Sequence, residues 1–366
     1  MDKIGILTFH SSNNFGSVLL AYAMQHIVES LGYGAEIIDF TTEKTKKAYA
    51  IFADMKKYGL HGLPYNTYAL LNYRKLKAKQ NKYDEFRKSC LKLTEKSYAV
   101  NDELQNEKFG YKAVICGSDQ IWNFDAYVYD DAYFLGFVPK GTKRIAYAPS
   151  LGVTKEFDKR LKDYKQELEA FDFLSVREVS GKDKLNKIVD KSVYIVPDPV
   201  FLLDRSEWDR LAGDEPLIKD KYILIYSIGY NPFLYETAKA LHRSCGYKMV
   251  SIMPDWRMVF FEGETAVDCG PKEFLNYIKN AEYVCSNSFH ASAFSIIFNK
   301  QFLFANGKSE DERITSVLSE YGIENRFIND TQQLKELEKI SYKEINTKVK
   351  ANREKALELL KRGIEK

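Results

Sequence analysis

The chain has few cysteines, and their arrangement does not point to metal or disulfide chemistry. Only five occur among 366 residues, and none forms a CxxC pair. Cys116 and Cys285 fall within apolar, strand-like runs, where a thiol acts as a small core residue. The chain also opens on an apolar strand pattern at 3–9 with no signal-peptide pattern before it. Together these features predict a protein of the reducing cytoplasm.

Several functional classes lack their defining features. No apolar run approaches the roughly 18 residues that cross a bilayer, so any membrane association is expected to be peripheral. Lys plus Arg total 54 against 51 Asp plus Glu, a balance that argues against nucleic acid as a partner. The motifs HExxH, GxxxxGK[ST] and GxSxG are absent. The sequence therefore predicts no metal, no P-loop and no hydrolase triad, and leaves an enzyme that binds anionic substrates in a cleft.

The order of apolar patterns predicts an α/β fold with two Rossmann-like domains that face each other across a cleft. Short β-rich runs alternate with helical patterns, which is typical of parallel sheets covered by helices. The length also exceeds what one core usually supports. We expect domains at 1–205 and 206–366, and the helical tail at 342–366 is a candidate to cross back onto the first. The expected strands are 4–9, 35–40, 113–116, 144–148, 173–176, 193–196, 222–227, 248–252, 282–285 and 301–304, and the main helices are 17–31, 232–244, 271–280 and 291–298.

A basic, aromatic segment at about 43–90 interrupts this alternation. Residues 43–88 hold twelve Lys or Arg and four Asp or Glu. The segment also carries Tyr49, Phe52, Tyr58, Tyr65, Tyr68, Tyr73, Tyr83 and Phe86. Such a mixture suits a peripheral contact with anionic headgroups or a polyprenyl-phosphate carrier. The alternative is a helical excursion with a solvated face.

The most informative stretch is Ser286, Asn287 and Ser288 followed by His290. It lies between an apolar strand and a helix, where backbone N–H groups and the helix dipole attract anions. An imidazole at that place can transfer a proton near neutral pH. The alternative is that the serines cap the helix and His290 packs against a neighbour.

Other candidates follow the predicted strands, where ligands of open α/β sheets bind. Asn13, Asn14 and Gly16 connect the first strand to its helix, and they suit a tight turn that contacts sugar hydroxyls or phosphate. The run Gly117, Ser118, Asp119 and Trp122 offers a carboxylate as base and an indole to stack on a sugar. Helix capping is the alternative for both loops. Arg177 is a candidate anion clamp, and Arg144 is a less favourable one. Arg313 and Lys308 are further cations that could reach the cleft, with surface ion pairs as the alternative.

Six ordered motifs resemble the polysaccharide pyruvyl transferase family over most of the chain. They are Ile4–His10 with Asn13–Gly16, Gly117–Asn123, Lys143–Ser150, Phe173–Glu178, Val196–Val200 and Ser286–His290. The resemblance implies a fold like that of GT-B glycosyltransferases. It also implies transfer of pyruvate from phosphoenolpyruvate to a sugar of a surface polysaccharide, with no cofactor, to form a cyclic ketal.

By this resemblance His290 is the acid or the phosphate-facing group, and Asp119 is the base or the sugar-hydroxyl ligand. Arg177 and the Ser286–Ser288 amides would hold the anions. Many members have an arginine where this chain has Ser288, so another cation, such as Arg313 or Lys308, or a different donor is expected. Two other functions stay open: a GT-B glycosyltransferase that uses a nucleotide sugar, and a non-catalytic scaffold for capsule assembly.

Overall fold

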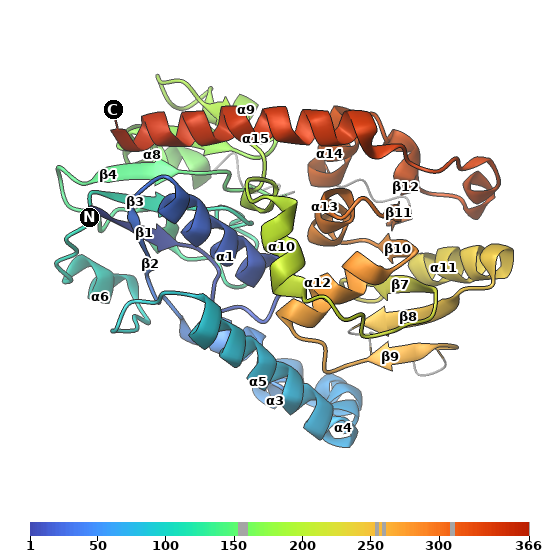
Figure 1. The fold of residues 1–366 in the computed structure, drawn as a ribbon. Helices are drawn as coiled ribbons and strands as arrows, with labels where there is room; N and C mark the ends of the chain where they lie inside the picture. Colours follow the sequence, from blue (N-terminus) through green and yellow to red (C-terminus); the bar gives the residue numbers. More distant parts are fainter. Residues whose placement is uncertain (153–159, 253–255, 258–260, 308–311, 366) are drawn as a thin grey trace. The chain divides into compact units, whose positions relative to one another are not determined.

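The chain folds around two six-stranded parallel sheets, as expected for two Rossmann-like domains (Figure 1). The computed structural model describes residues 1–152, 160–252, 256–257, 261–307 and 312–365. Two compact units divide the chain. Unit 1 comprises Met1–Tyr49, Arg87–Leu203 and Val349–Lys366, and unit 2 comprises Ala50–Phe86 and Asp204–Lys348. The two longest helices, α5 (Tyr73–Cys90) and α15 (Tyr342–Glu365), each contain residues of both units.

Unit 1 contains the sheet β2-β1-β3-β4-β5-β6. Its elements are β1 (Lys3–Leu7), α1 (Phe15–Ser30), β2 (Gly34–Ile37), α2 (Glu43–Ala48), α6 (Asn101–Gln105), β3 (Ala113–Cys116), η2 (Asp131–Phe134), β4 (Lys143–Ala146), η3 (Leu161–Tyr164), α8 (Lys165–Glu169), β5 (Phe173–Val176), α9 (Val179–Leu185), β6 (Tyr194–Ile195) and η4 (Pro199–Phe201). The chain passes from β1 to β2 on one side and returns to β3 on the other side of β1. The strand order therefore reverses between β1 and β3, and ligands of open α/β sheets bind at such a switch point.

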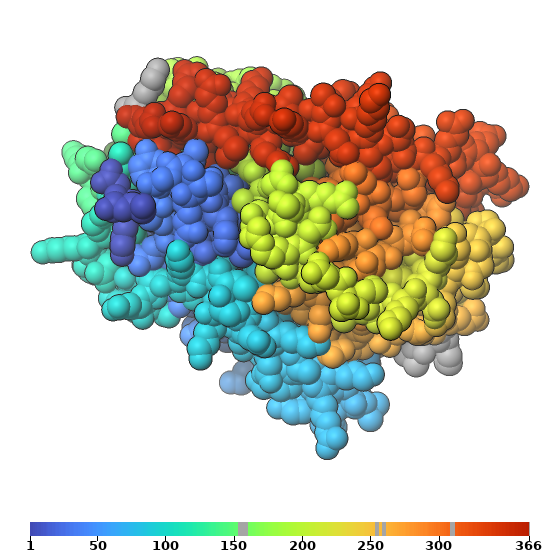
Figure 2. Space-filling model, in the orientation of Figure 1, coloured from blue at the N-terminus to red at the C-terminus, as the bar shows by residue number. Residues whose placement is uncertain are grey.

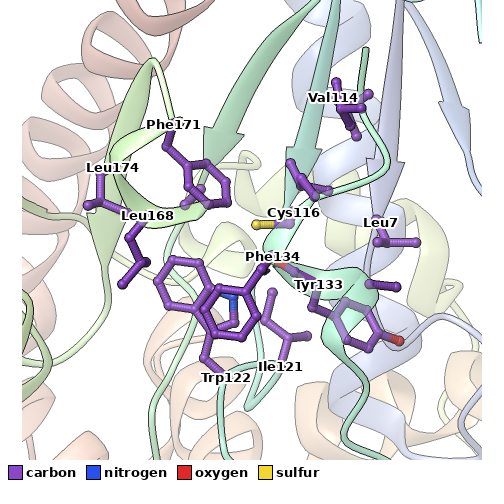
Figure 3. Packing of buried hydrophobic residues seen from close by; sticks show 14 of the residues in the cluster. Leu7, Val114, Cys116, Ile121, Trp122, Tyr133, Phe134, Leu168, Phe171 and Leu174 are labelled. Carbon is purple, nitrogen blue, oxygen red and sulfur yellow. Dashed lines mark hydrogen bonds between the residues drawn. The ribbon is translucent and has the colours of Figure 1, made fainter. Parts of the chain in front are cut away.

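The core of unit 1 is rich in aromatic residues, and it includes Trp122. The Trp122 ring is fully buried and stacks on Phe134 with centroids 5.2 Å apart, while Phe171 meets it edge-on (Figure 3). The indole Nε1–H donates to the carbonyl of Tyr133 at 3.1 Å. The prediction that Trp122 stacks on a sugar is therefore wrong, because its ring is fully buried in the core and its only donor is used there.

Unit 2 contains the sheet β12-β11-β10-β7-β8-β9. Its elements are α3 (Met55–Tyr58), η1 (Gly59–Gly62), α4 (Leu63–Leu71), α10 (Arg205–Ala212), β7 (Tyr222–Tyr226), α11 (Pro232–Cys245), β8 (Lys248–Ile252), β9 (Glu264–Ala266), α12 (Pro271–Asn280), β10 (Tyr283–Ser286), α13 (Phe289–Ile297), β11 (Gln301–Ala305), α14 (Glu312–Tyr321), η5 (Glu324–Arg326), β12 (Phe327–Ile328) and η6 (Thr331–Glu336). This is the strand order of dinucleotide-binding Rossmann folds, with the switch point between β7 and β10.

Most of the basic segment belongs to unit 2, where α5 anchors it. Lys82 on α5 lies 3.1 Å from Asp268 and 2.7 Å from Glu273, and Tyr83 is fully buried. Burial lowers the pKa of Lys79 to about 8 against the opposing effect of Cys269. Lys79 and Lys82 are therefore held within the protein and are poorly placed for a membrane.

The aromatic residues of the segment divide into three groups, of which one, Tyr49, Tyr65 and Tyr68, is half-buried. Tyr83 and Phe86 are core residues, whereas Phe52, Tyr58 and Tyr73 are exposed. Among the described residues, no helix is both long enough and apolar enough to cross a membrane.

Candidate functional site

Asp119 lies at the switch point of unit 1 and contacts the first turn of α1. The pairing of Leu7 with Cys116 places the loops after β1 and β3 side by side. One carboxylate oxygen of Asp119 accepts a hydrogen bond from the Ser17 hydroxyl at 2.5 Å, and the other accepts from the backbone N–H of Gln120 at 2.8 Å. Asp119 is only partly buried. A half-exposed carboxylate held at the carboxyl edge of the sheet can accept a proton from a bound hydroxyl.

Gly117 and Ser118 shape the loop that presents Asp119. A Cβ on Gly117 would lie 2.1 Å from the carbonyl oxygen of Tyr147, and the backbone φ of 127° also requires glycine. The buried Ser118 hydroxyl donates to the carbonyl of Ala148 at 2.7 Å and contacts a carboxylate oxygen of Asp198 at 3.2 Å. These predicted substrate-binding residues are instead positioning residues, because their groups are enclosed in the protein.

Arg177 is part of a buried ion-pair network. Its guanidinium lies 3.1 Å from Glu178 and 2.8 Å from Asp198, and its side chain is only 4% exposed. Burial opposes the charge, but Glu178, Asp198 and Asp119 more than compensate and raise the pKa of Arg177. The interpretation of Arg177 as an anion clamp is therefore corrected, since its charge holds Asp198, which in turn holds Ser118.

Arg144 also differs from the expectation. It lies at the amino end of β4, where its guanidinium donates to the carbonyl of Val138 and its backbone N–H donates to Asp172. Because ligands bind beyond the carboxyl ends of parallel strands, this position does not favour an anion clamp.

The loop before α1 is held by its own amides and by Arg87. Asn14 is the N-cap, and its side chain accepts from the N–H groups of Gly16 and Ser17 at 2.9 and 3.4 Å. The side-chain oxygen of Asn13 accepts from Arg87 at 3.1 Å. The capping alternative therefore holds for Asn14, whose cap makes α1 begin at Phe15 and brings Ser17 into its first turn.

Tyr49 lies next to this loop. Burial and the negative charge of Asp119 raise the pKa of Tyr49 to about 12, while a hydrogen bond with the Ser12 side chain opposes the shift. Its phenol therefore stays protonated and can donate a hydrogen bond near Asp119. Tyr49, one of the aromatic residues of the basic segment, thus lies beside Asp119 and Ser12 in unit 1.

Three carboxylates lie near Arg177 at the carboxyl edge of unit 1, and Arg87 supplies a second guanidinium at the loop before α1. Asp119, Glu178 and Asp198 all act electrostatically on the single guanidinium of Arg177. The carboxylate of Asp119 also lies against the first turn of α1. It takes the place in which the helix dipole would stabilise a bound anion. This edge consequently suits hydroxyl groups better than it suits phosphate.

The switch point of unit 2 is closed by side chains of the Ser286–Ser288 loop. The side-chain oxygen of Asn287 accepts from the N–H of Ile228 at 2.7 Å, and its amide nitrogen donates to the carbonyl of the same residue at 3.1 Å. The hydroxyl of Ser286 donates to the carbonyl of Tyr226 at 2.6 Å and accepts from the N–H of Ser288 at 3.0 Å. The Ser286 hydroxyl therefore joins the last residues of β10 and β7, and the Asn287 side chain joins the loops that follow them.

His290 is in the first turn of α13, which begins two residues earlier than the apolar pattern predicts. Ser288 is the N-cap, and its hydroxyl accepts from the N–H of Ala291 at 3.5 Å. His290 keeps 9% exposure, and its ring meets the ring of Phe289 edge-on with centroids 5.2 Å apart. The capping serine and a helix N-terminus that can attract anions thus occur together, although they are alternatives at the level of the sequence. Phe289 and His290 supply the first two backbone N–H groups of the helix.

The candidate cations differ in how the structure places them. Arg313 is half-buried in the first turn of α14, a helix that packs against α13. Lys308 lies outside the described residues. Arg257 was not predicted: its guanidinium lies 4.5 Å from the ring centroid of Tyr230, beyond the carboxyl end of β7. Among the described residues, no group of three or more His, Cys, Asp or Glu is arranged to hold a metal ion.

Ser17, Tyr49 and Arg257 are the residues that sequence reasoning missed. Ser17 stood at the expected start of the first helix, and its position three residues after a capping Asn was the available signal. Tyr49 and Arg257 gave no such signal, because their relevant neighbours are distant in sequence.

Comparison with known proteins gives a family and a fold. A family model described as polysaccharide pyruvyl transferase matches residues 14–308. No curated protein sequence matches the chain significantly.

Three solved structures are similar in fold, at very low sequence identity. The UDP-N-acetylglucosamine 2-epimerase from Rickettsia bellii has a TM-score of 0.53 at 8% identity, covering 98% of this chain and 96% of that one. The UDP-GlcNAc 2-epimerase from Methanocaldococcus jannaschii has a TM-score of 0.51 at 12% identity, covering 94% and 93%. A putative UDP-N-acetylglucosamine 2-epimerase from Listeria monocytogenes has a TM-score of 0.50 at 11% identity, covering 97% and 90%. These similarities concern the fold alone.

Proposed function

Because the chain belongs to the polysaccharide pyruvyl transferase family, we propose that it transfers pyruvate from phosphoenolpyruvate to two hydroxyls of a sugar in surface-polysaccharide synthesis. Family membership makes the protein a transferase, and the match across residues 14–308 is the observation that carries the proposal. The donor and the acceptor are inferred from the family, and the residue roles are inferred from charge and geometry.

The reaction needs one acid and one base. Protonation of the enol CH₂ creates an oxocarbenium-like centre, which the first sugar hydroxyl attacks. Phosphate then leaves, the second hydroxyl attacks, and a cyclic ketal results. The two hydroxyls release two protons, of which one replaces the proton given to the CH₂ group and the other leaves with phosphate. Each step is assisted by a group that can exchange a proton near neutral pH.

The charges of the two units favour different substrates. The carboxylate-rich edge of unit 1 would repel a donor that carries both phosphate and carboxylate, so we assign it to the sugar, with Asp119 as base. The first turn of α13 in unit 2 suits an anion, so we assign it to the donor, with His290 as acid. Arg257 and Arg313 are the candidates for the positive charge that many family members supply at the position of Ser288.

The test combines donor binding with product mass. The purified protein should be stabilised thermally by phosphoenolpyruvate. With a panel of galactose- and mannose-type acceptors it should release phosphate and add about 70 Da to the sugar, the mass that ketal formation requires. His290→Ala should lower kcat at least about a hundredfold with the fold retained.

Two results would contradict the proposal. Stabilisation by UDP or GDP but not by phosphoenolpyruvate would favour a nucleotide-sugar glycosyltransferase. Unchanged polysaccharide composition in cells that carry His290→Ala would favour a scaffold.

A further inference from the structure

The exposed apolar side chains of the molecule are concentrated in one helical segment. Of the sixteen large hydrophobic side chains exposed in the described part of the chain, eight lie between residues 52 and 73. They are Phe52, Met55, Tyr58, Leu60, Leu63, Leu70, Leu71 and Tyr73. Leu60, Leu70 and Leu71 are exposed by 78%, 68% and 81%. Clustered apolar exposure of this kind marks an interaction surface, whereas single exposed residues do not.

This segment, residues 52–77, is folded and anchored within unit 2. The side-chain amide of Asn66 accepts from the N–H of Ala53 at 2.7 Å and donates to its carbonyl at 3.3 Å, which ties α4 back to the start of the segment. Phe52 stacks on Tyr73 with centroids 6.1 Å apart. The following turns of α5 are fixed by the buried Tyr83 and by Lys82 with its two carboxylates. Atoms of the segment lie on the surface in the light-blue region at the bottom of Figure 2. The apolar side chains are therefore presented by an ordered element.

The charges of the segment identify the kind of partner. Residues 52–77 contain five Lys or Arg and one acidic residue, Asp54. Lys56, Lys57, Arg74, Lys75 and Lys77 are all exposed, and they precede and follow α4 along the chain. Leucines with phenylalanine and tyrosine, bordered by lysines, are the composition of interfacial membrane-binding helices. A second copy of the chain would bring two positively charged segments together, so self-association through this surface is disfavoured.

We propose that residues 52–77 form a docking surface for anionic phospholipid bilayers. The leucines and aromatic rings enter the interfacial region, and the lysines pair with the headgroups. Docking of this kind is peripheral and needs neither substrate. It also stands apart from the proposed reaction, so failure of one leaves the other untouched.

Vesicle co-sedimentation of the full-length protein tests the proposal. The protein should bind vesicles of phosphatidylcholine with about one-third phosphatidylglycerol at least tenfold more strongly than pure phosphatidylcholine vesicles. Binding should weaken in 0.5 M salt because charge attraction is screened (about 4 Å Debye length). Leu60→Ser with Leu70→Ser and Leu71→Ser should reduce binding at least tenfold, and so should Lys56→Glu with Lys75→Glu.

Matched control variants distinguish docking from non-specific adsorption to the vesicles. Val100→Ser with Val179→Ser and Leu217→Ser removes three exposed apolar residues elsewhere, and Lys335→Glu with Lys339→Glu reverses two exposed charges elsewhere. Both controls should bind within twofold of the unaltered protein. Circular dichroism melting checks that every variant folds.

Three outcomes would overturn the proposal. The first is a folded protein that does not bind anionic vesicles. The second is equal loss of binding in the segment and control variants. The third is an oligomer in light scattering that dissociates in the leucine variant, which would make the segment an interface between copies of the chain.

Discussion

At the scale of single residues, Asp119 is the candidate base, and its neighbours hold it in place. The Ser17 hydroxyl and the Gln120 N–H hold its two oxygens, and the loop around Gly117 fixes the backbone. A carboxylate fixed in this way does not need to reorganise before it accepts a proton. Its partial exposure leaves room for a sugar hydroxyl.

Asp119→Asn is expected to lower kcat at least about a hundredfold, because an amide cannot act as a general base. Binding of phosphoenolpyruvate, measured by calorimetry, should change less than twofold, since the donor is assigned to unit 2. Asp125→Asn is the control, because Asp125 is an exposed carboxylate six residues further along the chain. Activity of Asp119→Asn within threefold of the parent would remove Asp119 from the reaction.

Arg177 is expected to stabilise the folded protein through its buried ion pairs. Arg177→Met should lower the free energy of unfolding by about 3–5 kcal/mol, because the buried carboxylates of Glu178 and Asp198 lose their counter-charge. Arg210→Met removes an exposed pair with Glu207 and should cost about 0–1 kcal/mol. Urea unfolding followed by circular dichroism measures both. An Arg177→Met protein as stable as this control but weak in phosphoenolpyruvate binding would restore the anion-clamp interpretation.

At the scale of elements, the loop after β10 joins two strands and begins a helix within a few residues. Ser286 bonds the last residue of β7, Asn287 holds the loop after β7, and Ser288 caps α13. The position of His290 thus depends on hydrogen bonds that cross the switch point of unit 2. Side-chain amides and hydroxyls thus hold the chain in place at and just beyond the last paired strand residues.

Asn287→Ala should raise the KM for phosphoenolpyruvate about tenfold and leave kcat less affected. It removes two hydrogen bonds to Ile228, each contributing about 1 kcal/mol to the loop geometry. Asn280→Ala removes an amide at the far end of α12 and is the control. Steady-state kinetics at varied donor concentration would reject this role for Asn287 if both variants kept the parental KM.

Most elements could be predicted from their apolar patterns, since strands buried on both faces read as continuous apolar runs. Residues 113–116, 173–176, 248–252 and 271–280 agree at both ends with β3, β5, β8 and α12. The strands β9 and β12 were missed because they have three and two residues, too few for a pattern. Helices α1 and α13 begin two residues earlier than expected, because Asn14 and Ser288 cap them before the apolar pattern begins.

The candidate site was less predictable than the fold. Its loops could be located at strand ends from the sequence, and the structure places Asp119 and His290 there. The partners of Arg177 and Trp122 could not be foreseen, because Asp198 and Phe171 are distant along the chain. A motif residue that packs in the core is indistinguishable in sequence from one that contacts substrate.

At the scale of the whole molecule, two parallel sheets each offer a switch point with a different charge. Unit 1 presents carboxylates and hydroxyls, and unit 2 presents a helix N-terminus with His290. One proton-transfer group is proposed in each unit, Asp119 in unit 1 and His290 in unit 2. This division follows from the local chemistry of each edge and matches a reaction with an anionic donor and a neutral sugar acceptor.

The measurement that tests this account most directly is the mass of the sugar product formed in D₂O. If an acid that exchanges its proton with solvent protonates the enol CH₂, the ketal methyl group should contain one deuterium. After the sugar hydroxyls have returned to protium, the added mass should be about 71 Da, compared with about 70 Da in H₂O. His290→Ala should form this product at least about a hundredfold more slowly. Absence of any phosphoenolpyruvate-dependent product across the acceptor panel, from a protein that also fails to bind phosphoenolpyruvate, would contradict the account.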